Sequence, residues 1–269
     1  MSAVTERPAP LDEALAAPRA PCRQVQQARL RFQGVTKEFD DGTEALRAIS
    51  FSVSPGELVA LVGPSGCGKS TLLRLASGLT APTNGHIEVG TGPVGYVFQD
   101  ATLLPWRTVL GNVELLGQLH GVPKDERRRT ALAAIQTVGL SGSEHKYPRA
   151  LSGGMKMRVS LARALTMSPN VFLFDEPFGA LDEITRQRLN EELLQLFQDR
   201  WFAALFVTHS VAEAVFLATR VLVMSGRPGA VIADIPVTFG YPRRPELRYA
   251  AEFASLAGQV GAALQEGHS

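Results

Sequence analysis

A nine-residue segment, GPSGCGKST at positions 63–71, carries the strongest chemical signal in this chain. It fits the pattern G-x-x-x-x-G-K-[ST], whose glycines let successive backbone N–H groups turn inward around anionic oxygens. Lys69 can supply a point charge for the terminal phosphates, and the hydroxyl of Ser70 can bind a magnesium ion. The residues expected to hold the phosphates are Gly63, Pro64, Ser65, Gly66, Cys67, Gly68, Lys69, Ser70 and Thr71.

The segments on either side of this loop agree with the motif. Residues 58–62 form a continuous apolar run, which is typical of a buried parallel strand. A helix is expected to begin at Thr71, with its positive N-terminal end toward the phosphates. A chance glycine-rich turn before a helix is the alternative, but the strand, loop and helix follow in the order that the phosphate site requires.

Two acids end a second apolar run, VFLFDE at residues 171–176. A buried strand of this kind presents its last residues at the edge of a parallel sheet where ligands bind. There Asp175 can orient the water shell of magnesium, and Glu176 can polarise an attacking water. Two solvated acids at a strand end are the alternative, and the phosphate loop argues against it.

A further glycine-containing segment, LSGGM at residues 151–155, precedes a helix expected over residues 156–167. Ser152 can cap this helix, while Gly153 and Gly154 leave backbone N–H groups open. The segment therefore predicts a second anion site at a helix N-terminus. Taken alone, the same residues would equally fit an ordinary helix cap.

Composition limits the class of protein. With 269 residues and 45% hydrophobic residues, the chain can form a sizeable core. A net charge of +1 gives no electrostatic reason to expect a nucleic-acid partner. Cys22 and Cys67 are too few for a disulfide framework or a zinc site, which suits a reducing cytoplasm. We see no secretory signal and no apolar run long enough to span a bilayer.

Strand and helix signals alternate over most of the chain, which predicts a mostly parallel sheet flanked by helices, with a helical insertion in the middle. Strands are expected at residues 28–32, 49–53, 58–62, 86–89, 94–98, 171–174, 203–207 and 221–224. Further helices are expected at residues 108–120, 126–138, 184–197, 211–218 and 250–264. The first two strands should form an antiparallel pair around a turn at residues 40–43, and residues 86–89 should pair with residues 94–98.

The order of GPSGCGKST, Gln99, LSGGM, VFLFDE, Leu181-Asp182 and His209 resembles the nucleotide-binding subunit of ABC transporters. The resemblance covers about Leu30 to Ile235. It implies an α/β fold with a RecA-like P-loop core, an antiparallel β subdomain and an inserted α-helical subdomain. We therefore expect a mobile tail at residues 1–28, a nucleotide-binding domain at residues 29–235 and a C-terminal extension at residues 236–269. The helical subdomain should cover about residues 100–157.

The same resemblance implies roles for individual residues. Phe39 resembles the aromatic residue that stacks on adenine, although plain strand packing is the alternative. Gln99 resembles the glutamine that senses magnesium and the attacking water. Asp182 resembles the acid of the loop that crosses to the other subunit. His209 resembles the histidine that contacts the γ-phosphate and holds Glu176 and the water in place.

The family also implies head-to-tail homodimers, with ATP and Mg²⁺ between the P-loop of one subunit and Ser152, Gly153 and Gly154 of the other. Met155 departs from the glutamine that often ends this signature, but the phosphate contacts do not require that side chain. Cys67 is expected to be exposed when the site is empty. It is then either a tolerated small residue or a thiol whose alkylation blocks ATP.

Two further segments bear on the transporter class. The apolar segment Leu103–Leu110 contains Trp106, and it forms either part of the groove for a membrane subunit or the interior of the helical subdomain. Together with LSGGM and residues 225–231, it resembles the nitrate, sulfonate and taurine group of bacterial importers.

The implied function is an ATPase at the cytoplasmic face of the inner membrane that energises import of a small anionic solute. Its direct partners would be permease subunits, with a periplasmic solute-binding protein as an indirect one. The alternatives are an importer for another solute and a DNA-repair or translation ATPase of the same family. Long heptads, a cysteine cluster or a second cassette would mark the non-transport classes, and the sequence has none of them. An exporter would usually fuse membrane helices, and an unrelated P-loop kinase or GTPase would not need LSGGM or His209.

Overall fold

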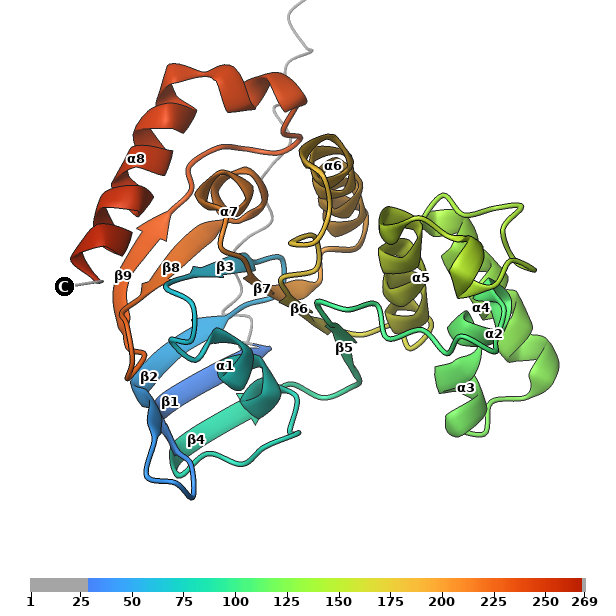
Figure 1. The fold of residues 1–269 in the computed structure, drawn as a ribbon, viewed down its shortest axis with the longest axis horizontal. Coiled ribbons are helices and arrows are strands. Elements are labelled where there is room, and N and C mark those ends of the chain that lie inside the picture. The colour runs from blue at the N-terminus through green and yellow to red at the C-terminus, as the bar shows by residue number, and fades with distance from the viewer. Residues whose placement is uncertain (1–28, 268–269) are drawn as a thin grey trace, which may run out of the picture.

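The computed structural model describes residues 29–267, so the tail expected at residues 1–28 lies outside the described part. Two β-sheets form the centre of the molecule (Figure 1). The smaller one is antiparallel and has the strand order β2-β1-β4, where β1 is Leu30–Glu38, β2 is Glu44–Val53 and β4 is Asn84–Val89. The turn predicted at residues 40–43 joins β1 to β2, and Phe39 N–H donates to the carbonyl of Thr43 there at 3.0 Å.

The larger sheet has six strands in the order β5-β6-β7-β3-β8-β9. These are β5 (Val94–Val97), β6 (Val171–Asp175), β7 (Ala203–Val207), β3 (Leu58–Val62), β8 (Arg220–Met224) and β9 (Val231–Pro236). The first five run parallel, and β9 pairs antiparallel with β8. Every residue of β3, β6 and β7 is buried, as continuous apolar runs predict. The predicted mostly parallel sheet beside an antiparallel one is confirmed.

One predicted strand pairing is wrong. Residues 86–89 belong to β4, which pairs with β1, whereas residues 94–97 form β5, which pairs with β6. The two segments are neighbours in sequence but belong to different sheets. The short connection between these two segments suggested a hairpin, but in the structure it links the antiparallel sheet to the larger sheet.

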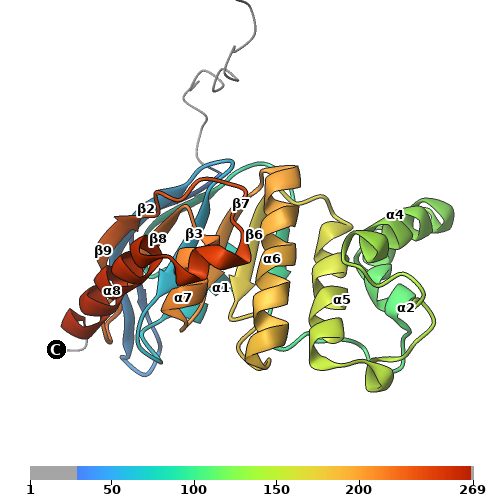
Figure 2. The same ribbon diagram turned by 90° about the horizontal axis from the view of Figure 1, so that it is seen from above.

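The two faces of the larger sheet are covered differently (Figure 2). Along β3, Val59 and Leu61 face a core that includes α1 (Lys69–Ala76) and the antiparallel sheet. Leu58 and Ala60 face a second core that includes α6 (Glu183–Arg200), α7 (Val211–Leu217) and α8 (Ala251–Glu266). This alternation is the period of two that a strand buried on both faces must show.

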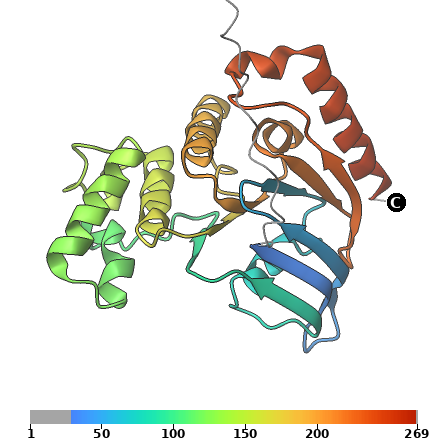
Figure 3. The ribbon, with the colours of Figure 1, turned by 180° about the vertical axis from the view of Figure 1, so that it is seen from behind.

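A group of helices projects to one side of the sheets (Figures 1 and 3). It comprises α2 (Val109–Val113), α3 (Leu115–Leu119), α4 (Lys124–Thr137), the 3₁₀ turn η1 (Pro148–Ala150) and α5 (Gly153–Leu165). The single helix expected at residues 108–120 is therefore two short helices. The first is capped by the Thr108 hydroxyl, which accepts from Gly111 N–H.

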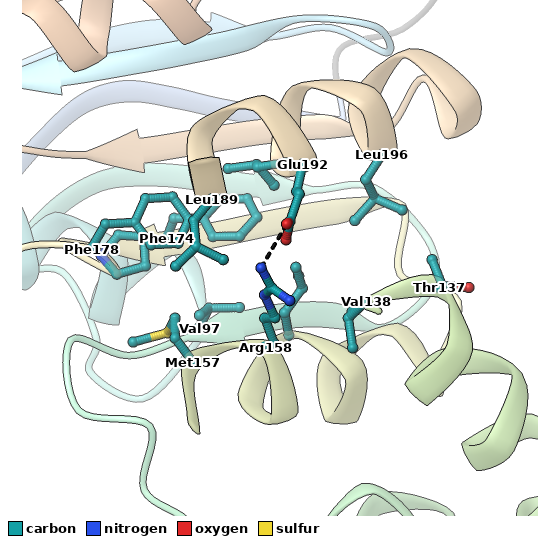
Figure 4. A pocket seen from close by; sticks show the side chains of 13 residues that line it. Val97, Thr137, Val138, Met157, Arg158, Phe174, Phe178, Leu189, Glu192 and Leu196 are labelled. Atoms are coloured by element: carbon teal, nitrogen blue, oxygen red, sulfur yellow. Dashed lines mark hydrogen bonds and ion pairs between the residues drawn. The ribbon is translucent and has the colours of Figure 1, made fainter. Parts of the chain in front are cut away.

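An apolar pocket lies between α5 and α6, where this helical group packs against the rest of the core (Figure 4). Side chains of α5 and α6 point into it from opposite sides, together with Val138 at the end of α4. A single ion pair crosses it, from Arg158 Nη2 on α5 to Glu192 Oε1 on α6 at 2.6 Å. The joint between the two parts therefore has little directional bonding.

The C-terminal segment packs over α7. Its elements are β9, the 3₁₀ turn η2 (Pro245–Tyr249) and α8, of which β9 was not predicted. Arg243, which is 7% exposed, donates to the carbonyls of Val215, Phe216 and Ala218 at 3.2, 2.8 and 2.9 Å. Tyr241 donates its hydroxyl to the carbonyl of Leu217 at 3.0 Å. These two side chains thus satisfy the four carbonyls that the end of α7 leaves unpaired.

Candidate nucleotide-binding site

The P-loop (residues 63–71) connects β3 to α1 at the C-terminal edge of the parallel strands. The helix begins at Lys69, two residues before the predicted start at Thr71, with Gly68 as its N-cap at φ 103°. A Cβ on Gly68 would lie 2.7 Å from Leu46 Cδ2 and 2.9 Å from the Ala45 carbonyl oxygen. Both the left-handed backbone and the close approach of β2 therefore require glycine at this position.

Lys69 is held inside the loop that it completes. Its Nζ donates to the carbonyls of Gly63 and Pro64, each at 2.8 Å, and its residue is 6% exposed. Burying an ammonium group is costly unless it is paired, so these carbonyls hold the charge in place until an anion arrives. The loop therefore presents a preformed positive site.

Cys67 differs from its prediction. The residue is 1% exposed, and its Sγ lies 3.8 Å from Lys69 Nζ. A Cβ on Gly63 would lie 3.0 Å from this sulfur, so the thiol fills the space beneath the loop. The expectation of an exposed thiol in the empty site is wrong because the turn directs this side chain toward the core. The structure agrees with a small buried residue.

Asp175 at the end of β6 lies directly beside the P-loop. Its Oδ1 accepts from the Ser70 hydroxyl at 2.8 Å, and its Oδ2 accepts from the Tyr96 hydroxyl at 3.2 Å. Burial, followed by the charge of Asp175, raises the pKa of Tyr96, so the phenol stays a donor. Tyr96 was not predicted as a site residue, since a tyrosine in a short strand has no distinguishing sequence signal.

Glu176 and His209 meet, as predicted, at the ends of neighbouring strands. His209 Nδ1 lies 3.3 Å from Glu176 Oε2. Glu176 has a left-handed backbone at φ 45°, and its N–H donates to the Val207 carbonyl of β7 at 3.0 Å. Such a conformation in a non-glycine residue costs of order 1 kcal/mol and recurs at functional sites. The backbone conformation at the end of β6 therefore fixes the direction of the Glu176 carboxylate.

A buried network fixes the loop that carries His209. The Thr208 hydroxyl donates to the carboxylate of Glu213, and Ser210 N–H donates to the Thr208 hydroxyl at 3.0 Å. The Ser210 hydroxyl in turn caps α7 by accepting from Glu213 N–H at 3.3 Å. Burial raises the pKa of Glu213, against the opposing hydrogen bond from Thr208.

Phe39 lies just beyond the end of β1 and lines the same pocket as the P-loop. The pocket is bounded by Phe39, Ala45, Ser65, Gly66, Gly68, Lys69, Ser70, Thr71, Glu176 and Arg227. Phe39 is 43% exposed, so it is not part of the core packing that was the alternative. Lys37 Nζ lies over this ring, 5.4 Å from its centroid, so stacking of Phe39 on adenine stays a prediction.

The predicted signature residues, Asp182 and Gln99 do not line this pocket within one chain. Ser152 caps α5 by accepting from Met155 N–H at 3.3 Å, and a Cβ on Gly153 or Gly154 would meet Leu181 or Thr185 of the neighbouring segment. Asp182 caps α6 by accepting from Thr185 N–H at 3.0 Å, which is the main reason why its pKa is lowered. Gln99 is exposed on the loop after β5. The signature and the Asp182 loop thus pack against each other, away from the P-loop pocket.

The apolar segment Leu103–Leu110 is partly buried and partly exposed. Leu103 packs against the core, and Leu104 exchanges backbone hydrogen bonds with the buried side chain of Asn112. Trp106, in contrast, is 71% exposed. Interior packing therefore holds for Leu103 and is wrong for Trp106.

The donors at the site suit a magnesium–triphosphate. Ser70 and Asp175 offer hydroxyl and carboxylate oxygens side by side, which are the ligands that Mg²⁺ prefers. Across residues 29–267 no group of three or more His, Cys, Asp or Glu side chains could hold a metal alone. Magnesium would therefore depend on phosphate oxygens and water for its remaining ligands. Within the same residues, no helix is both long and apolar enough to cross a bilayer.

Comparisons with known proteins agree with this geometry. Residues 46–179 match the family model described as ABC transporter. The chain is 45% identical over 218 residues to the taurine import ATP-binding protein TauB of Yersinia pestis bv. Antiqua (strain Antiqua), covering 78% of this chain and 85% of the relative. It is 46% identical over 236 residues to the aliphatic sulfonates import ATP-binding protein SsuB of Rhodopseudomonas palustris, covering 86% and 81%.

Solved structures show the same fold. The dimeric structure of MJ0796, a bacterial ABC transporter cassette, superposes with a TM-score of 0.69 at 30% identity, covering 78% of this chain and all of that one. A post-hydrolysis dimer of the same cassette, bound to ADP and Pi, gives a TM-score of 0.69 at 29% identity.

Proposed function

Because the chain belongs to the ABC transporter family as an ATP-binding, ATP-hydrolysing subunit, we propose that it energises a bacterial importer for a small sulfonate such as taurine. Both relatives described above are named as import subunits, one for taurine and one for aliphatic sulfonates. Nitrate, the other solute class of the expected group, is named for neither. Sulfonates are therefore the better supported cargo.

The observation that carries the mechanism is the incompleteness of the site in one chain. The P-loop pocket contains Lys69 and Glu176 but none of the signature residues Ser152, Gly153 and Gly154. Ser152 and Gly153 at the start of α5 are exposed, whereas Gly154 is buried and the Met155 N–H donates to the Ser152 hydroxyl. A second copy, packed head to tail, would place its signature over the open side of the pocket. ATP would then be bound by both subunits and would draw them together.

Within the closed site, each residue has a role that follows from its position. Lys69 and the loop N–H groups would bind the phosphates, and Phe39 would stack on the adenine. Glu176 would orient and polarise the attacking water, while His209, 3.3 Å from it, would hold the carboxylate in place. When bound by Ser70, Asp175 and Gln99, Mg²⁺ would neutralise charge that develops on the phosphates. Loss of the γ-phosphate removes one bond between the subunits and lets them separate.

The helical group would connect this cycle to the membrane. Trp106 is 71% exposed, which is costly for so large an apolar side chain without a partner. We assign it to the surface that receives a permease subunit at the cytoplasmic face of the membrane. A periplasmic binding protein would deliver the solute to the permease and would not touch this chain.

The central experiment compares Glu176→Gln with the double variant Lys69→Ala, Glu176→Gln. The single variant should hydrolyse ATP about a hundredfold or more slowly, because it lacks the general base, and should elute as a dimer when ATP is present. The double variant should remain monomeric at every ATP concentration. Normal turnover by Glu176→Gln would exclude the proposed base, and ATP-dependent dimers of the double variant would exclude the phosphate role of Lys69.

The cargo requires its own test. The complex of this chain with its permease is reconstituted in proteoliposomes together with the binding protein, and ATP hydrolysis is measured with taurine, nitrate or neither. Stimulation by taurine and not by nitrate is expected. Stimulation by nitrate alone would replace the sulfonate proposal while leaving the ATPase assignment intact.

A further inference from the structure

The turn between β8 and β9, residues 225–230, reaches across to the P-loop. The hydroxyl of Ser225 lies 3.0 and 3.2 Å from the carbonyl oxygens of Gly226 and Pro228, to either of which it can donate, and it accepts from Ala230 N–H at 3.0 Å. Gly229 is tied to β2, because its N–H donates to the Ala45 carbonyl at 3.0 Å and its carbonyl accepts from Arg47 N–H at 2.9 Å. The turn is therefore fixed at both of its ends.

The same turn lies directly against the phosphate loop. A Cβ on Gly229 would lie 2.0 Å from the Cys67 carbonyl oxygen and 2.7 Å from Met224 Cε. Contacts this short exclude any side chain at Gly229 without a shift of the backbone. The P-loop therefore rests on the turn as well as on β3 and α1.

Arg227 makes the polar contact between the turn and the loop. Its Nη2 and Nε donate to the Gly66 carbonyl at 3.1 and 3.3 Å. Arg227 is exposed and lines the pocket that also contains Phe39, Lys69 and Glu176. No carboxylate within residues 29–267 forms an ion pair with it. Its charge is thus placed at the edge of the pocket without a carboxylate of the described residues in direct contact.

The charge of Arg227 also reaches the turn that follows Phe39. The pKa of Asp41 in that turn is lowered chiefly by the hydrogen bond from Thr43 N–H, and in smaller part by the charge of Arg227. The guanidinium group contacts Gly66 of the loop expected to bind phosphates, and Arg227 lines the same pocket as Phe39, which is expected to bind the adenine. A guanidinium group has five N–H donors, and two of them are directed to Gly66.

We propose that Arg227 is a further nucleotide-binding residue, which holds the Gly66 peptide in place and adds a positive charge for the phosphate chain of the nucleotide. This proposal rests on the proposed function of the P-loop pocket. Binding the Gly66 carbonyl offsets an oxygen dipole that would otherwise lie close to the incoming phosphates. The remaining N–H donors of Arg227 can contact the anionic ligand directly, as a guanidinium group does well.

The test measures binding of a fluorescent ATP analogue and of its ADP counterpart, together with kcat and KM for ATP hydrolysis. Arg227→Ala should weaken binding of both nucleotides about tenfold, the effect of one charge-assisted hydrogen bond. KM should rise in proportion while kcat stays within about twofold, because Glu176 is untouched. Arg227→Lys should restore about half of the loss on a logarithmic scale, since it keeps the charge but not the paired donors. Raising the salt concentration should reduce the difference in nucleotide affinity between wild type and Arg227→Ala, because salt screens the charge of Arg227.

Two further variants test whether the position of the turn matters for nucleotide binding. Gly229→Ala should also weaken nucleotide binding, because the added Cβ pushes the turn away from the P-loop while Arg227 is retained. Arg128→Ala removes an exposed arginine of α4, far from the pocket in the fold, and should leave binding unchanged.

Clear outcomes would overturn the proposal. Nucleotide affinity of Arg227→Ala within twofold of wild type, with Lys69→Ala strongly impaired, would reject the role of Arg227 and keep the P-loop assignment. Normal binding by both variants would reject the P-loop pocket itself. A loss of binding by Arg227→Ala that is accompanied by a fall of more than about 5 °C in melting temperature, and that Arg227→Lys does not restore, would assign the residue to folding instead.

Discussion

Replacement of Arg243 by methionine tests how the C-terminal segment holds α7, the helix that follows His209. Methionine keeps much of the apolar volume but has no donor. The substitution removes the donor for four carbonyls. Three are those of Val215, Phe216 and Ala218 at the end of α7, and the fourth is that of Phe239, which accepts at 2.9 Å. At about 1 kcal/mol for each lost bond, the expected loss is about 4 kcal/mol.

One opposing effect reduces this value. Burial lowers the pKa of Arg243, which reports that the folded protein bears a cost for holding the charged guanidinium group away from water. Removing the charge recovers part of that cost, so a net loss of about 3 kcal/mol is expected. For a domain of this size, that corresponds to a fall of about 6–12 °C in melting temperature.

The assay is urea unfolding followed by circular dichroism, with the protein free of nucleotide. Arg244→Met is the matched control, because the neighbouring Arg244 is exposed and should change stability by no more than about 0.5 kcal/mol. If the two variants unfold within about 1 kcal/mol of each other, the Arg243 side chain is not what secures the end of α7, and the reasoning fails.

Two other perturbations address the site itself. Tyr96→Phe keeps the ring but removes the donor to Asp175, so the Mg²⁺ concentration for half-maximal ATP hydrolysis should rise about tenfold; an unchanged Mg²⁺ titration would count against this orienting role. Glu213→Gln tests the buried acid. Because burial raises the pKa of Glu213 above its ordinary value of 4.5, the folded protein binds more protons than the unfolded chain, and wild-type stability must fall as the pH rises above that value. The melting temperature of Glu213→Gln relative to wild type should therefore increase from about pH 5 to about pH 8, and a constant difference would contradict the assignment.

The central strands were predictable because each is a continuous apolar run. The strand predicted at residues 203–207 coincides with β7, and residues 171–174 fall within β6. What the pattern could not supply was the partner of each strand. β4 is largely exposed and has almost no alternation, so only its hydrogen bonds with β1 show that it belongs to the smaller sheet. β9 was missed for a similar reason, since its residues lie at a sheet edge and are only half-buried.

In the candidate site, too, some residues could be predicted from the sequence and others could not. Lys69, Glu176 and His209 could be identified because their spacing and order carry chemistry that is rarely needed elsewhere. Tyr96 and Arg227 lie on a strand and a turn whose sequences have no such pattern, and only the fold brings Tyr96 to Asp175 and Arg227 to the pocket. The side-chain direction of Cys67 was equally hidden, because it depends on the curl of a loop rather than on residue type.

The apolar pocket between α5 and α6 bears on how the signature is held. Apolar contacts have little directional preference, so these two helices are held mainly by burial and close packing rather than by the geometry of polar groups. Among the side chains drawn in Figure 4, the ion pair between Arg158 of α5 and Glu192 of α6 is the polar contact that joins the two helices. The signature at the start of α5 is thus joined to α6 mainly by apolar contacts. Substitutions along these contacts are expected to shift the signature and change the affinity between two copies, although none of the residues concerned lines the nucleotide pocket.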